Sequence, residues 1–138
     1  ASIGAQVAFP KSLVIDIAGD GSIQMNIQEL ATAVQYNLPV KIVILNNRFL
    51  GMVRQWQELF YEKRYTWTHM NHAPDFVKLA EAYGAAGYRI TDEKDVDDVL
   101  HKAFNNNKTT IVDVHVNPEE CVYPMVPAGA PLKDMLLV

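Results

Sequence analysis

The sequence predicts an α/β fold: a doubly wound, mainly parallel sheet with helices on both faces, followed by an irregular C-terminal tail. Three apolar runs, at 13–18, 40–45 and 111–116, do not alternate with polar residues. Such runs are typical of parallel strands buried on both faces. Segments with helical apolar spacing lie between them, and alternation of strand and helix favours right-handed crossovers.

The elements follow in order along the chain. Residues 1–8 resemble the end of a helix, which Phe9-Pro10 closes before the first strand. The chain begins without Met, and we expect it to be a piece of a longer protein. A weaker fourth strand is predicted at 87–90. The last helix ends at 105–108, and four prolines then punctuate a tail that regular helix cannot accommodate.

Three helices are indicated by apolar residues spaced i, i+3, i+4 and i+7. These residues are Ile27, Leu30, Ala31 and Val34; Phe76, Leu79, Ala80 and Tyr83; and Val96, Val99, Leu100 and Ala103. The first helix is expected to begin near Asn26 and to stop at 37–39. Pro74-Asp75 opens the second, with the proline in its first turn. A shorter helix is predicted at 51–61, with Val53, Trp56 and Phe60 on one side.

Composition limits the classes of function. The chain has 138 residues, of which 49% are hydrophobic and 20% charged, as in an ordinary soluble globular domain. A net charge of −4 gives no electrostatic case for binding nucleic acid or an anionic membrane. The single cysteine, Cys121, excludes an internal disulfide and fits a reducing compartment. No apolar stretch approaches the length that spans a bilayer.

Polar residues follow two of the predicted strands. Gly19-Asp20-Gly21 ends the first run and Asn46-Asn47 ends the second. In parallel sheets both positions lie at the carboxyl edge, where ligands bind. Glycines let a bulky anion approach the backbone, and hard oxygen ligands suit Mg²⁺ carrying a phosphate ester better than zinc or copper. Gly21 is expected to open a loop whose N–H groups are available to a diphosphate.

Other candidate residues are assigned structural roles. Cys121 has no basic group nearby in the sequence and is interpreted as an inert thiol. His69 and His72 have no visible third ligand, so no metal site is predicted there. The acidic run at 92–98 suits a helix start and is predicted to be a solvated face.

The motif residues resemble those of thiamin-diphosphate enzymes. Within that superfamily the chain is most similar to the catalytic subunit of acetohydroxyacid synthase, also called acetolactate synthase. The resemblance covers effectively the whole chain. Its segments are 19–26, 28–33, 45–47, 50–56, 74–76, 79–84 and 122–125. The motif marks the cofactor, and Gly-Met-Val-Arg-Gln-Trp at 51–56 favours the synthase over its relatives.

The resemblance implies roles for particular residues. Side chains of Asp20 and Asn47 and the backbone carbonyl of Phe49 would bind Mg²⁺. Trp56 would shape the pocket for the second 2-keto acid, with Ala128 near its rim. The residues expected to contact the cofactor are Gly19, Asp20, Gly21, Ser22, Asn47, Phe49, Leu50, Gly51 and Met52.

The resemblance also implies an organisation and an activity. Residues 1–117 would form the thiamin-diphosphate domain without its N-terminal part, and 118–138 a Pro-rich tail that covers the active site. The enzyme would be a transferase of branched-chain amino acid biosynthesis that condenses the hydroxyethyl group from pyruvate with pyruvate or 2-ketobutyrate. The activating glutamate would lie outside this chain, so no catalytic residue is assigned and the isolated chain is expected to be inactive.

Cofactors and partners follow from the same resemblance. They are thiamin diphosphate and Mg²⁺, with FAD bound elsewhere in the full-length enzyme. We expect a homodimer with the active site at the subunit interface and a regulatory small subunit, in the bacterial cytoplasm or, for a plant protein, the plastid. Two alternatives stay open: another thiamin-diphosphate 2-keto acid decarboxylase or oxidase, and a non-enzymatic Mg²⁺-binding receiver domain.

Overall fold

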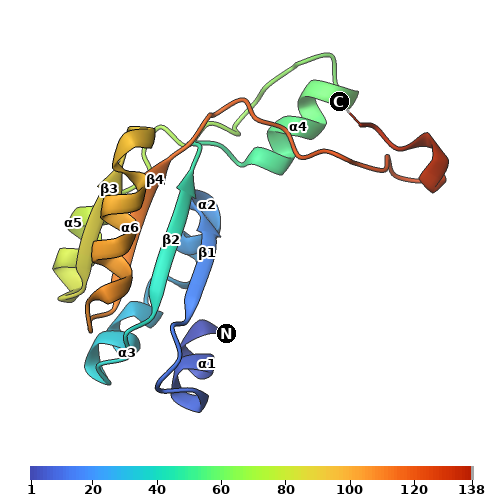
Figure 1. The fold of residues 1–138 in the computed structure, drawn as a ribbon. Helices are drawn as coiled ribbons and strands as arrows, with labels where there is room; N and C mark the ends of the chain where they lie inside the picture. The colour runs from blue at the N-terminus through green and yellow to red at the C-terminus, as the bar shows by residue number, and fades with distance from the viewer. Residues whose placement is uncertain (138) are drawn as a thin grey trace.

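Four parallel strands form a single sheet within residues 1–137, which the computed structural model describes. The strands are β1 (Ile15–Gly19), β2 (Lys41–Asn46), β3 (Ala86–Ile90) and β4 (Thr110–His115), in the order β1-β2-β4-β3. All three strand pairs are parallel. The α/β fold class is therefore confirmed, and all carboxyl ends of the strands lie at one edge (Figure 1). The last position of the predicted tail, Val138, lies outside the described residues.

Helices cover both faces of the sheet, as predicted. On one face lie α2 (Asp20–Ile23), α3 (Glu29–Gln35) and α5 (Phe76–Tyr83), and on the other lies α6 (Val96–Asn105). A short N-terminal helix, α1 (Ser2–Ala8), lies near the amino end of β1 (Figure 1). The 3₁₀ turns are η1 (Gln24–Asn26), η2 (Glu93–Asp95) and η3 (Leu132–Asp134).

One further helix stands apart from these layers. Helix α4 (Gly51–Phe60) lies beyond the carboxyl edge of the sheet, where the tail from 118 onward passes it (Figure 1). The tail is irregular except for η3 and an isolated bridge between Met125 and Leu136. This confirms the predicted irregular tail over the described residues, and the tail lies beyond the carboxyl edge of the sheet.

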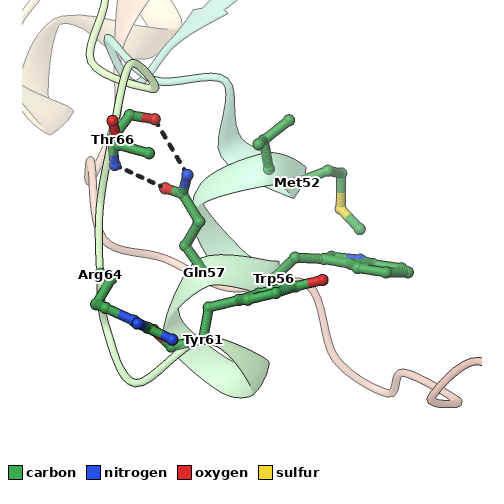
Figure 2. A pocket seen from close by; sticks show the side chains of 7 residues that line it. Met52, Trp56, Gln57, Tyr61, Arg64 and Thr66 are labelled. Carbon is green, nitrogen blue, oxygen red and sulfur yellow. Dashed lines mark hydrogen bonds between the residues drawn. The ribbon is translucent and has the colours of Figure 1, made fainter.

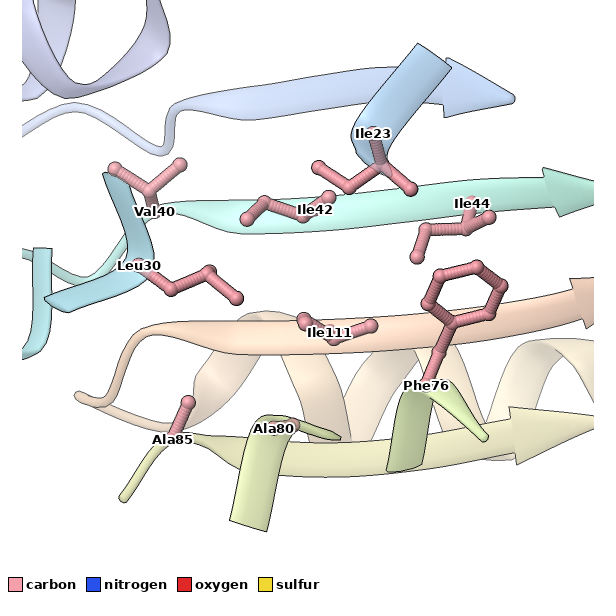
Figure 3. Packing of buried hydrophobic residues seen from close by; sticks show 9 residues of the cluster. All are labelled: Ile23, Leu30, Val40, Ile42, Ile44, Phe76, Ala80, Ala85 and Ile111. Carbon is pink, nitrogen blue, oxygen red and sulfur yellow. The ribbon is translucent and has the colours of Figure 1, made fainter. Parts of the chain in front are cut away.

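Two apolar clusters hold the sheet between its helices. Alternate residues of β2 face opposite sides, so Ile42 and Ile44 pack toward α5 while Val43 packs toward α6. Figure 3 shows the larger cluster. Its buried members are Ile23, Leu30, Val40, Ile42, Ile44, Phe76, Ala80, Ala85 and Ile111. Burial of apolar side chains in these clusters is the main contribution that stabilises the sheet, and it thereby holds the strand ends in their relative positions.

Helix α5 shows how local sequence fixes an element's ends. Asp75 is the N-cap, and its carboxylate accepts hydrogen bonds from the N–H groups of Val77 and Lys78. Gly84 ends the helix at φ 81°, a conformation that costs glycine little. Pro74 therefore precedes the cap and does not lie in the first turn, because the aspartate takes the capping position.

Two other predictions need correction. The helix expected near Asn26 is α3, which begins at Glu29, but a separate short helix, α2, begins at Asp20, so Gly21 belongs to a helical turn and opens no loop. The first apolar run is not buried on both faces: Ile17 is 62% exposed and Ile15 40%. β1 is an edge strand, and α6 covers only the β4 and β3 side of that face.

Candidate functional site

The two predicted motifs meet at the carboxyl edge of the sheet. In the register of β1 and β2, Gly19 pairs with Leu45, so the next residues, Asp20 after β1 and Asn46 at the end of β2, lie at the same edge of the sheet. Both side chains are buried, Asp20 to 1% exposure and Asn46 to 7%. The prediction that a carboxylate and carboxamides gather at one edge is confirmed at the level of the strand ends.

Asp20 is a buried carboxylate that the protein leaves partly unsatisfied. Burial raises its pKa, and nearby Asp113 raises it further. Backbone N–H groups of Asp20, Gly21 and Arg48 act in the opposite direction and favour the charged form. The Oδ2 atom is buried and has no hydrogen-bond partner among residues 1–137. A buried anionic oxygen without a donor is costly, and a cation would compensate it.

The loop after β2 presents oxygen atoms to the same edge. The Oδ1 atom of Asn47 accepts a 3.0 Å hydrogen bond from the Phe49 N–H, which folds the loop into an Asx turn. Phe49 forms an antiparallel bridge with His69, made by Leu50 N–H to Thr68 and Met70 N–H to Arg48. Because backbone groups alternate along an extended segment, the Phe49 carbonyl points away from that bridge.

Glycines allow the two motifs to approach each other. A Cβ at Gly21 would lie 2.9 Å from Leu50 Cδ2 and 3.2 Å from Met70 Sδ. A Cβ at Gly51 would lie 2.9 Å from Asn47 Nδ2. The close approach of Gly21 to Leu50 brings residues 19–22 and 49–52, which are predicted to contact the cofactor, into one neighbourhood. Ser22 lies at its exposed side, where its hydroxyl already exchanges hydrogen bonds with the Gly19 backbone.

A polar network behind these residues was not predicted from the sequence. Asn46 Nδ2 donates to Asp113 Oδ1 at 2.8 Å, and Arg89 Nε donates to Asp113 Oδ2 at 3.0 Å. Arg89 Nη2 reaches Asp75 at 2.6 Å, and His115 Nε2 lies 3.5 Å from Asp113. A carboxylate within the apolar run at 111–116 was the signal available, because such a residue is rarely buried without partners.

Trp56 lies in a different part of the edge, on the outward face of α4. A cleft of about 490 Å³ is lined by Met52, Val53, Trp56, Gln57, Tyr61, Arg64 and Thr66 (Figure 2). A second cleft, of about 250 Å³, lies between Trp56, Phe60, Tyr61 and tail residues Pro127 and Ala128. The structure thus brings Ala128 close to Trp56, and Asp20 and Asn47 line neither of these two clefts.

The residues assigned structural roles show no competing site. Among residues 1–137, no group of three or more His, Cys, Asp or Glu side chains could hold a metal ion. His69 instead packs its ring 4.6 Å from that of Phe49. The acidic residues at 92–98 are exposed, as predicted. A ligand set of one carboxylate, one carboxamide and one carbonyl falls outside such a group, so this finding leaves the predicted Mg²⁺ ligands untested.

The fold and the edge define the class of protein. A profile described as "Thiamine pyrophosphate enzyme, C-terminal TPP binding domain" matches residues 1–114, and the chain belongs to this family. This membership leaves no room for the receiver-domain alternative. A solved thiamine diphosphate-dependent 4-hydroxybenzoylformate decarboxylase from Rhodococcus jostii superposes with a TM-score of 0.79 at 33% identity. That match covers 86% of this chain and 23% of the decarboxylase.

Curated relatives narrow the resemblance to one kind of enzyme. The chain is 49% identical over 138 residues to the acetolactate synthase large subunit of Haemophilus influenzae and 48% identical over 140 residues to the isozyme 3 large subunit of Escherichia coli. Each match covers 99% of this chain and 24% of the relative, so the chain spans about a quarter of their length. The predicted resemblance to acetolactate synthase is confirmed. Within residues 1–137 there is no helix of the length and apolar character that crossing a membrane requires.

Proposed function

We propose that this chain is the part of an acetolactate synthase that holds Mg²⁺ and the diphosphate of thiamin diphosphate. The observation that carries the proposal is Asp20: a buried carboxylate at a strand end whose Oδ2 lacks a partner within residues 1–137. Such an oxygen fits a hard divalent cation. Its neighbours fit the rest of the ligand set, since Asn47 offers a carboxamide oxygen and Phe49 a carbonyl directed away from its bridge.

The residues around the cation would receive the diphosphate. Gly19, Gly21 and Ser22 on one side, and Leu50, Gly51 and Met52 on the other, are assigned to this contact. The close approach of Gly21 to Leu50 supports the assignment, because both segments then border one space. Mg²⁺ would neutralise the diphosphate and orient it. In this proposal residues 1–117 are the cofactor-binding part and the tail from 118 onward covers the substrate side.

The chain's own residues bind and orient, and the cofactor supplies the reactivity. When bound, thiamin diphosphate provides the electron sink for decarboxylating a 2-keto acid and joining the remaining two-carbon unit to a second one. The proposed substrates are pyruvate and, as the second keto acid, pyruvate or 2-ketobutyrate, in branched-chain amino acid synthesis. Trp56 would line the pocket for that second acid. No residue of this chain is assigned as the catalytic acid or base.

The remaining assignments rest on the relatives. We propose a homodimer with the active site at the subunit interface, a regulatory small subunit, and FAD bound outside this chain. A bacterial cytoplasm, or a plastid in a plant, is the proposed location. The runner-up function is that of a thiamin-diphosphate decarboxylase, because the Rhodococcus jostii enzyme shares the fold at 33% identity. Product analysis separates the two, since only the synthase makes acetolactate from pyruvate.

Calorimetric titration tests the cofactor assignment. The protein that carries this chain is titrated with thiamin diphosphate with and without Mg²⁺, alongside Asp20→Asn, Asn47→Ala and the matched control Asp98→Asn, whose side chain is exposed. Binding should require Mg²⁺, and the Asp20 and Asn47 variants should weaken it about tenfold or more, the range expected when metal ligation is disturbed. Unchanged binding by Asp20→Asn would refute the proposal.

A further inference from the structure

Helix α4 is built with its polar side inward. Its buried residues are Arg54 and Gln55, whereas Met52, Val53, Trp56 and Phe60 are each at least 42% exposed. A helix on the surface of a globular protein normally buries its apolar stripe. The side chains that attach α4 to its surroundings are therefore polar, and two of them are the glutamines on either side of Trp56.

Gln55 holds the C-terminal tail. Its Oε1 atom accepts a 2.7 Å hydrogen bond from the Val122 N–H, and its Nε2 atom donates to the Val122 carbonyl at 2.9 Å. The side chain is 2% exposed, so both hydrogen bonds are shielded from water. One carboxamide thus satisfies both backbone groups of a residue 67 positions away, as a neighbouring strand would.

Gln57 holds the loop that follows α4 in the same manner. Its Oε1 atom accepts from the Thr66 N–H at 3.3 Å, and its Nε2 atom donates to the Thr66 carbonyl at 3.1 Å (Figure 2). The Thr68 hydroxyl adds a third hydrogen bond to Oε1 at 3.3 Å. Two glutamines that lie two positions apart in the sequence therefore each form a pair of hydrogen bonds to a different segment of irregular backbone.

Trp56 lies between the two gripped segments. The loop held by Gln57 supplies Arg64 and Thr66 to the larger cleft beside Trp56. The tail held by Gln55 supplies Pro127 and Ala128 to the smaller one. Val122 is 61% exposed and Trp67 is 97% exposed, so neither of these apolar side chains anchors its segment by burial. Hydrogen bonds to irregular backbone therefore matter more here than in the sheet.

We propose that Gln55 and Gln57 are positioning residues that independently fix the two backbone walls on either side of Trp56. This inference rests on the proposed function in one respect: if Trp56 lines the pocket for the second keto acid, the two glutamines set the width of that pocket. Within residues 1–137 neither glutamine hydrogen-bonds to the residues assigned to Mg²⁺, so their role is separable from cofactor binding.

Hydrogen exchange resolved to single amides tests the independence of the two contacts. In the protein that carries this chain, Gln55→Met should speed exchange of the Val122 amide about fivefold and leave Thr66 unchanged, the size expected for one hydrogen bond. Gln57→Met should do the reverse, so each variant is the matched control for the other. Gln55→Glu and Gln57→Glu keep the accepting oxygen but set a second carboxylate oxygen against the Val122 or Thr66 carbonyl, so each should protect its amide less than the parent glutamine does.

Fluorescence tests whether the walls shield Trp56. In a background where Trp56 is the only tryptophan of the protein, which within this chain requires Trp67→Phe at an almost fully exposed ring, acrylamide should quench Trp56 more in each Met variant than in the parent. Equal acceleration of both amides in either Met variant, or no change in either amide, would overturn the inference. So would quenching of Trp56 that neither substitution alters.

The choice between pyruvate and 2-ketobutyrate as second substrate separates this inference from the proposed function. Gln55→Met, whose side chain lines neither cleft, should shift the ratio of kcat/KM for the two acids while the Kd for thiamin diphosphate with Mg²⁺ stays within twofold of the parent, about 0.4 kcal/mol. If the amides respond as expected and the ratio of kcat/KM for the two acids does not change, the roles of the two glutamines are supported and the assignment of the Trp56 cleft to the second keto acid is refuted. If cofactor binding is absent altogether, the cofactor proposal falls while the amide result still decides the inference.

Discussion

Asn46 Nδ2 donates a 2.8 Å hydrogen bond to Asp113 Oδ1, joining the end of β2 to the interior of β4. Asp113 is 1% exposed and also accepts a hydrogen bond from Arg89. Arg89 donates a further hydrogen bond to Asp75, the N-cap of α5. The hydrogen bond determines how the Asn46 carboxamide is turned, because only its nitrogen can donate to a carboxylate. The buried Oδ1 atom is thereby held in place at the edge where Asp20 emerges.

Asp113→Asn should destabilise the protein by about 2 kcal/mol, since the substitution removes one of the two carboxylates paired with Arg89 and leaves a single oxygen for two donors, Asn46 and Arg89. The measurement is the free energy of unfolding by denaturant. Asp98→Asn, at an exposed position, is the control and should lie within about 0.5 kcal/mol of the parent. Equal effects of the two substitutions would show that the buried network contributes nothing.

Most of the sheet could be predicted because burial leaves a pattern in the sequence. The runs at 40–45 and 111–116 are the two central strands, covered on both faces, and the apolar spacing placed α5 and α6 to within a few residues. The edge strand β1 was located correctly, but its exposure was not predicted. An apolar run indicates that a strand can be buried on both faces. It does not indicate whether another element of the same chain packs on each face.

The site was predictable only where residue type and strand end coincide. Asp20 and Asn46 follow apolar runs, so topology alone brings them together. The contacts of Gln55 and Gln57 were out of reach, because their partners are backbone groups of Val122 and Thr66 in segments without periodicity. Nothing in the spacing of a glutamine indicates which distant carbonyl it will meet.

Gly51→Ala should weaken Mg²⁺-dependent binding of thiamin diphosphate about tenfold with little loss of stability. The new Cβ would lie 2.9 Å from Asn47 Nδ2, so the carboxamide assigned to Mg²⁺ must move. Gly4→Ala is a matched control, because a Cβ there meets no atom within 4 Å in the described part of the chain. Calorimetry with both variants checks this prediction, and equal Kd values would argue against Asn47 as a ligand.

The ion pair between Asp75 and Arg89 should make stability depend on acid pH. The hydrogen bond from Arg89 holds the pKa of Asp75 below its ordinary value of 3.8, with the N–H of Lys78 adding to the effect. A lowered pKa in the folded state means that the stabilisation is fully present above the unfolded value and is lost as the pH falls through the folded one.

Asp75→Asn isolates this effect, because asparagine still caps α5 but carries no charge. The parent should be more stable than the variant at neutral pH, and the difference should begin to shrink below about pH 3.8 and disappear only once the pH has fallen through the lower pKa of the folded carboxyl group. Unfolding free energies measured across this range check the prediction. A difference that stays constant with pH would mean that the variant disturbs the cap and that the charge plays no part.

Lys41 sets two opposing effects against each other. Its side chain is 1% exposed, and burial lowers its pKa, so the charged form is disfavoured. In compensation, Nζ donates to the carbonyls of Asn106 at 2.7 Å and Lys108 at 2.8 Å, and to Asn106 Oδ1 at 3.1 Å. These carbonyls lie just after the end of α6, where no backbone N–H group of the helix is available to donate to them.

The hydrogen bonds should outweigh the burial of the charge. Lys41→Met keeps the length of the side chain but leaves two carbonyls without their donor, at about 1–3 kcal/mol for each such group. The variant no longer has to desolvate an ammonium group, and this offsets part of the lost stability. The free energy of unfolding should therefore fall by about 2 kcal/mol in total. Lys102→Met, exposed on α6, is the matched control and should change stability by less than about 0.5 kcal/mol. A stability of Lys41→Met equal to or above that of the parent would mean that burial of the charge costs more than its three hydrogen bonds return.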